Sequence, residues 1–113
     1  MKGILVNNEY CTGCHSCEVA CKKYLDLPVG EFGIKVMEVG PWEYSKALKG
    51  VDKWEWTWTP ILSKACNMCE SRTIKGKMPM CVQHCQAWCM QYGETEELVK
   101  KMDGKTRWVL LTR

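Results

Sequence analysis

Only a few short stretches of the chain alternate or repeat in a way that predicts secondary structure. Residues 3–7 and 107–112 are apolar and rich in strand-forming residues, so they predict a first and a last strand. Residues 54–59 alternate strictly between tryptophan and polar residues, which predicts a strand that projects three indoles from one face. Residues 95–101 predict a short helix, with Thr95 as its N-cap, acidic residues in its first turn and lysines in its last. Together these elements indicate a small α+β protein.

Nine cysteines among 113 residues change this picture. A chain of this length is expected to form a single domain, residues 1–113, and so small a core usually needs cross-links or metals for stability. The net charge of +3 excludes an acidic or polyanion-binding tail, and no helix-turn-helix or zinc-finger spacing indicates a nucleic-acid partner. We find neither a signal-peptide core nor an apolar run of about 18 residues. We therefore expect no direct membrane span and a cytoplasmic protein, unless a signal-bearing partner exports it in folded form.

The first cysteine run has the spacing of a bacterial ferredoxin. Cys11, Cys14, Cys17 and Cys21 read C-x2-C-x2-C-x3-C, which is typical of iron–sulfur ligation. Three thiolates at two-residue intervals can wrap one face of a cluster, whereas Cys21 lies one helical turn further on and is placed for a second cluster. Zinc sites favour two separated C-x2-C pairs, so this tight run favours iron and sulfide over zinc.

The second cysteine run repeats this pattern with a loop inserted in it. Its spacing is C-x2-C-x11-C-x3-C, which makes the two runs a degenerate internal repeat. In such pairs the last cysteine of each run ligates the cluster of the other run, which predicts a pseudo-two-fold arrangement. We therefore expect two [4Fe–4S] clusters, the first held by Cys11, Cys14, Cys17 and Cys85, and the second by Cys21, Cys66, Cys69 and Cys81.

The ninth cysteine, Cys89, is left over by this assignment. We expect a buried free thiol there. The alternative is that Cys85 and Cys89 act as ligands in place of Cys81 and Cys85. For the cysteines as a whole, a zinc-binding structural or interaction module is a second interpretation. A disulfide scaffold is a third, and the odd number of cysteines and the missing export signal disfavour it.

At its cysteine runs, at Leu27-Pro28 and at residues 76–87, the chain resembles the small ferredoxin-type iron–sulfur subunits of molybdenum or tungsten pterin oxidoreductases of the dimethyl sulfoxide reductase family. The resemblance covers most of the chain and is weakest at residues 49–59. It implies a ferredoxin-like fold whose two clusters relay electrons between a large pterin-containing catalytic subunit and an external carrier. In the family a proline commonly follows the last cysteine of a run, where this chain has Lys22 and Gln86. A freestanding ferredoxin that serves several enzymes is the alternative.

Residues 26–63 form a long, aromatic-rich insertion between the two cysteine runs. The three tryptophans of residues 54–59, with Trp42 and Tyr44 nearby, allow two interpretations. The strand either packs its indoles onto the cluster domain as ordinary core or presents them to a partner subunit, since aromatic residues are enriched at protein interfaces.

We expect no catalytic residue in this chain. It offers no nucleophile–base pair and no nucleotide-binding glycine loop, so alone it should catalyse nothing on an organic substrate. His15 and His84 lie within the cysteine runs. We interpret both as hydrogen-bonding loop residues, and the alternative is that they tune a cluster potential through a hydrogen bond to sulfur.

Overall fold

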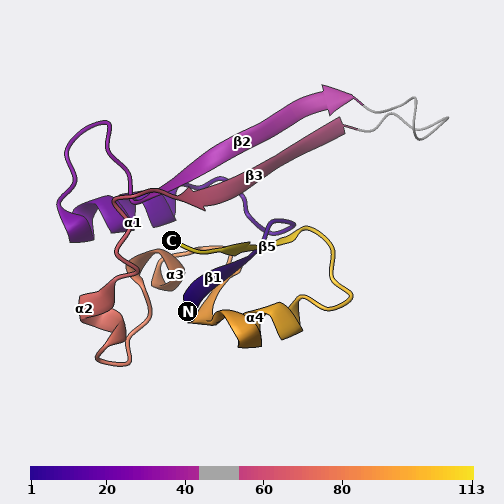
Figure 1. Cartoon of the computed structure of the whole chain (residues 1–113). Coiled ribbons are helices and arrows are strands. Elements are labelled where there is room, and N and C mark those ends of the chain that lie inside the picture. The colour runs from indigo at the N-terminus through magenta and orange to yellow at the C-terminus, as the bar shows by residue number, and fades with distance from the viewer. Residues whose placement is uncertain (44–53) are drawn as a thin grey trace.

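The protein, described by a computed structural model over residues 1–43 and 54–113, contains two small antiparallel sheets and four helices (Figure 1). One sheet has three strands in the order β4-β1-β5, and the other is the hairpin of β2 and β3. This mixed architecture is compatible with the expected α+β class. The elements are β1 (Lys2–Asn7), α1 (Ser16–Leu25), β2 (Ile34–Glu43), β3 (Trp54–Leu62), α2 (Glu70–Thr73), α3 (Met80–Gln83), β4 (Met90–Glu94), α4 (Thr95–Lys101) and β5 (Trp108–Leu111).

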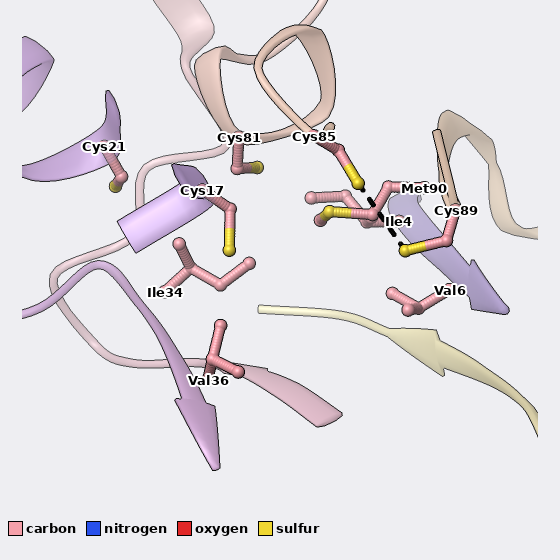
Figure 2. Close-up of a cluster of buried hydrophobic side chains, with 10 residues drawn as sticks. All are labelled: Ile4, Val6, Cys17, Cys21, Ile34, Val36, Cys81, Cys85, Cys89 and Met90. Atoms are coloured by element: carbon pink, nitrogen blue, oxygen red, sulfur yellow. Dashed lines mark hydrogen bonds between the residues drawn. The ribbon is translucent and has the colours of Figure 1, made fainter. Parts of the chain in front are cut away.

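The core lies between the three-stranded sheet, α1 and the base of the hairpin. Strand β1 is the central strand of its sheet, and Ile4, Leu5 and Val6 on it are at most 1% exposed. Half of the ten residues in the central buried cluster are cysteines, which lie beside aliphatic residues such as Ile34 (Figure 2). Sulfur therefore fills much of the space that aliphatic side chains occupy in an ordinary small domain.

The hairpin of β2 and β3 extends well past the three-stranded sheet (Figure 1). Its base is held by buried Ile34 and Val36. Further out, the pairing shifts between Val39 and Trp42. Within this bulge Gly40 has a φ of +97°, and a Cβ there would collide with the backbone of β3, so glycine is required. Glycine and proline in this stretch indicate turns in the sequence, and the pairing with β3 overrides that signal.

Most of the elements predicted from the sequence are present. The strands predicted at residues 3–7 and 107–112 are β1 and β5, which pair with each other. The predicted helix is α4, but the N-cap assignment is wrong by one residue. Glu94 is the N-cap and Thr95 is the first helical residue, because β4 runs directly into the helix. Among the described residues, no helix combines the length and the apolar character needed to cross a bilayer.

Candidate metal centre

The first cysteine run is a loop that turns directly into α1. His15 caps the helix in a left-handed conformation, and α1 then carries Cys17 and Cys21 on its buried face, as the four-residue spacing predicts. In the loop, Gly13 has a φ of +71° and lies against the ring of Trp58, where a Cβ would collide with the indole. The indole of β3 therefore fixes how closely the loop approaches the hairpin.

A first group of thiols surrounds one pocket under this loop. Burial raises the pKa of Cys17 to about 12, and the neighbouring thiols of Cys11 and Cys85 add to the rise. Cys14 lies at the exposed edge, where a hydrogen bond with the Ser16 side chain lowers its pKa. The cysteines that line the pocket are Cys11, Cys14, Cys17, Cys85 and Cys89.

A second group of thiols lies at the other end of α1. Burial raises the pKa of Cys21, and the nearby thiols of Cys66 and Cys69 raise it further. Cys81, on α3, has its pKa raised chiefly by burial and then by Cys69. Two backbone N–H groups in this region point at sulfur, from Met68 to Cys66 Sγ at 3.4 Å and from Met80 to Cys69 Sγ at 3.4 Å. Such donors offset the negative charge of a ligating thiolate.

The first group therefore brings Cys85 and Cys89 of the second run to the three cysteines of the first loop. In the second group, Cys66 and Cys69 lie near enough to Cys21 and Cys81 to raise their pKa. Thiolates are soft ligands suited to iron–sulfur clusters and to zinc, and a bound cation deprotonates a thiol that coordinates it. Among the described residues, no three His, Cys, Asp or Glu side chains are arranged to hold one metal ion. A [4Fe–4S] cluster makes a different demand, because each of its four thiolates binds a separate iron. The donor set fits a cluster in each group.

Cys89 belongs to the first group. Its Sγ lies 3.5 Å from Cys85 Sγ (Figure 2). A hydrogen bond between Cys89 and Cys11 raises the pKa of the Cys89 thiol and lowers that of Cys11. All nine cysteines are free of disulfide bonds, and Cys89 is buried, as expected from the sequence. What the sequence does not reveal is which thiols surround it.

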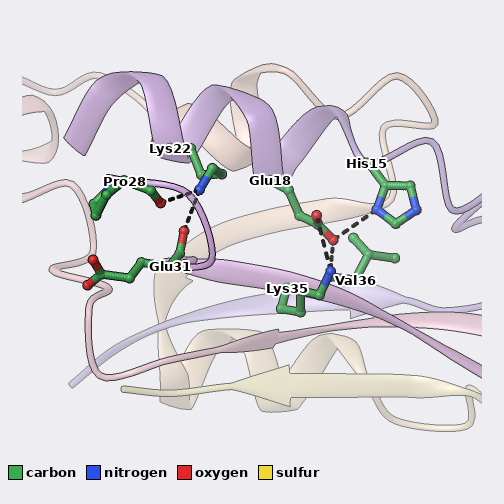
Figure 3. A network of polar contacts seen from close by, with 7 residues as sticks. All are labelled: His15, Glu18, Lys22, Pro28, Glu31, Lys35 and Val36. Atoms are coloured by element: carbon green, nitrogen blue, oxygen red, sulfur yellow. Dashed lines mark hydrogen bonds and ion pairs between the residues drawn. The ribbon is translucent and has the colours of Figure 1, made fainter. Parts of the chain in front are cut away.

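A buried carboxylate ties the first cysteine loop to the hairpin (Figure 3). Glu18 Oε2 accepts a hydrogen bond from the Val36 backbone N–H at 2.5 Å and lies 2.9 Å from His15 Nδ1. Lys35 Nζ lies 3.7 Å from the other oxygen. His15 is thus a hydrogen-bonding loop residue, and so is His84, whose Nδ1 lies 3.0 Å from the Met80 carbonyl oxygen. Glu18 was not singled out by any sequence pattern, since an acidic residue in a first helical turn is common.

The loop after α1 is fastened to the helix by a single lysine. Lys22 Nζ donates to the carbonyl oxygens of Pro28 at 2.9 Å and of Glu31 at 2.6 Å (Figure 3). The chain then reaches Gly33, which lies so close to Cys21 Sγ that a Cβ would collide with it. This close approach brings the start of the hairpin against the second thiol group.

The three tryptophans of β3 have different environments, so neither interpretation of this strand holds for all of them. Trp58 is half-buried and meets the His15 ring edge-on, with 5.7 Å between ring centroids. Trp54 and Trp56 are 59% and 61% exposed, and Trp42 on the paired strand is 50% exposed. Tyr44, named with them, lies outside the described residues.

No protein-family model matches the chain. Among curated proteins it is similar to the B subunit of the anaerobic dimethyl sulfoxide reductase of Escherichia coli, with 29% identity over 94 residues that cover 81% of this chain and 40% of that protein. It is also similar to YnfG, a probable anaerobic dimethyl sulfoxide reductase subunit of E. coli, with 26% identity over 98 residues that cover 87% of this chain and 34% of that protein. The chain spans less than half the length of these relatives.

Proposed function

We propose that this chain is an electron-transfer iron–sulfur protein with two [4Fe–4S] clusters. The observation that carries the proposal is that Cys85 lines one pocket with the first run, while Cys21 lies near Cys66 and Cys69 of the second run. An exchange of last cysteines between two runs is how two-cluster ferredoxins hold their clusters. The first cluster would be held by Cys11, Cys14, Cys17 and Cys85, and the second by Cys21, Cys66, Cys69 and Cys81.

The clusters would supply the redox chemistry, and the chain would hold them near each other. Cys17 and Cys21 are ligands of different clusters on adjacent turns of α1, only about 6 Å apart along the helix axis. A helix that carries one ligand of each cluster keeps the clusters adjacent, so an electron can pass from one to the other. The exposed thiol of Cys14 brings the edge of the first cluster to the protein surface. Electrons would enter or leave through that edge.

The partner we propose is a large catalytic subunit with a molybdenum or tungsten pterin, which would exchange electrons with an external carrier through the two clusters. The similarity to subunits of anaerobic dimethyl sulfoxide reductases supports this partner. The outer part of the hairpin supports it as well, because Trp42, Trp54 and Trp56 expose indole surface there. Tryptophan is enriched among the residues that dominate binding energy at protein interfaces.

Metal analysis of anaerobically purified protein tests the proposal. We expect about eight irons and about eight acid-labile sulfides per chain, with absorption at about 400 nm that dithionite bleaches. An iron count of about four would mean that only one thiol group binds a cluster. A colourless protein that contains zinc would refute the proposal in favour of a structural zinc module. Co-purification of a pterin-containing subunit would separate a dedicated subunit from a freestanding ferredoxin.

A further inference from the structure

Cys85 and Cys89 form a pair of thiols at one corner of the first group. Their Sγ atoms are 3.5 Å apart, and the two residues are only 8% and 7% exposed (Figure 2). Both also interact with the first run, Cys85 with Cys17 and Cys89 with Cys11. The pair and the three cysteines of the first loop line one pocket, although the expected ligand set uses only one member of the pair.

The backbone holds the two thiols together by independent contacts. Cys85 follows α3, and its carbonyl oxygen accepts the N–H of Trp88 at 3.3 Å, which closes a tight turn. Trp88 adopts a left-handed conformation with a φ of +54° and returns the chain toward the sheet. Cys89 is then anchored by the Asn7 N–H, which donates to its carbonyl oxygen at 2.8 Å, and β4 begins at the next residue. The position of Cys85 is thus fixed by the end of α3, and the position of Cys89 by the start of β4 beside β1.

The spacing of the pair suits exchange at one metal. A bond between a metal ion and a thiolate is about 2.3 Å long in zinc proteins, so two sulfurs 3.5 Å apart are both within reach of one ion. Each iron of a [4Fe–4S] cluster takes a single cysteine thiolate. Only one member of the pair can therefore bind at a time, and the other remains a thiol beside it.

We propose that Cys85 and Cys89 share the fourth ligand position of the first cluster, so that either thiolate completes it. This inference rests on the proposed function. In the exchange, the iron–sulfur bond to one cysteine breaks and a bond to the other forms. One proton moves from the incoming thiol to the leaving thiolate, and no oxidation state changes. Retention of the first cluster then does not depend on a single cysteine of the second run.

Alanine variants of the two cysteines test this sharing by iron and sulfide content. Cys85→Ala and Cys89→Ala are each expected to keep about eight irons per chain, whereas the double variant falls to about four. Cys81→Ala is the matched control, because the cysteines that interact with Cys81, which include Cys17 of the first group, are all assigned as ligands and none is spare. It should fall to about four irons and so show that the assay detects a lost cluster.

Several outcomes would overturn the inference. Cys85→Ala with about four irons means that Cys89 does not replace it, and a double variant with both clusters means that neither thiol is the ligand. If Cys85→Ala cannot be isolated in folded form, two other variants are reconstituted with iron and sulfide and compared. One is Cys85→Ser with Cys89 intact, and the other combines Cys85→Ser with Cys89→Ala. Equal iron in these two variants also overturns it. A wild-type chain without iron would instead refute the proposed function itself.

Discussion

Replacing Glu18 tests whether a buried carboxylate fastens the hairpin to the first cysteine loop. Its side chain is 8% exposed, and it accepts the N–H of Val36, which is itself only 4% exposed. Among the described residues, strand β2 pairs only with β3, so no described strand on its outer edge accepts such N–H groups. Glu18→Ala removes the acceptor and leaves this buried donor without that partner, whereas Glu18→Gln keeps an amide oxygen in nearly the same place.

The expected loss in the free energy of unfolding follows from how exposed each partner of Glu18 is. A buried donor left unsatisfied costs about 1–3 kcal/mol. The ion pair with Lys35, whose side chain is 39% exposed, adds at most about 1 kcal/mol after solvent screening. Removing a buried charge also recovers some desolvation free energy. We therefore expect Glu18→Ala to lower the free energy of unfolding by about 2 kcal/mol, equivalent to about a 30-fold change in a rate or an equilibrium constant. Glu18→Gln should cost less than about 1 kcal/mol.

The assay is the rate at which anaerobic holoprotein loses its visible absorption at a fixed urea concentration. A rate is the suitable measure because unfolding with loss of a cofactor is not a reversible two-state process. Glu18→Ala should bleach up to about 30-fold faster than the wild type, and Glu18→Gln within about fivefold of it. Lys35→Ala is the control, since it removes the screened ion pair and a cation–π contact with Phe32 but keeps the Glu18 carboxylate that accepts the Val36 N–H. Equal rates for Glu18→Ala and Lys35→Ala would refute the reasoning.

Two further predictions concern single positions with matched controls. Gly33→Ala places a Cβ against Cys21 Sγ and should lower the iron content from about eight toward about four. Gly93→Ala is the control and should leave the iron content unchanged, because its Cβ would meet only ordinary contacts of 3.7 Å or more. Iron analysis of both variants is the measurement, and equal iron contents would contradict the prediction. Trp56→Ser should retain both clusters but weaken binding to the catalytic subunit by more than about 2 kcal/mol, while Trp58→Ser should lose iron from the isolated chain because its indole packs against the first cysteine loop. Iron retention and partner pull-down are measured on the same samples, and iron loss in Trp56→Ser would mean that its indole is core.

Features that depend on local spacing follow from the amino-acid sequence alone. The four-residue interval between Cys17 and Cys21 predicts one buried helical face, and α1 presents both residues there. The apolar runs at the two ends predict β1 and β5, and the charge pattern of residues 95–101 predicts α4 to within one residue of its cap. The similarity of the two cysteine runs also predicts that the two thiol groups have similar sets of ligands. Each of these inferences uses neighbours within a few residues, where backbone geometry alone sets which side chains share a face.

Which residues meet across the long insertion is a property of the tertiary structure. Cys89 has no local signal for its place beside Cys11 and Cys85, because that place depends on the turn at Trp88 and on the pairing of β4 with β1. The indoles of Trp56 and Trp58 belong to one alternation pattern, yet of the two only Trp58 contacts the cysteine loop. The reason is that the hairpin begins to extend away from the rest of the protein between these two residues. Periodicity assigns a side chain to a face of its own strand, whereas what covers that face depends on contacts between segments that are distant in the chain.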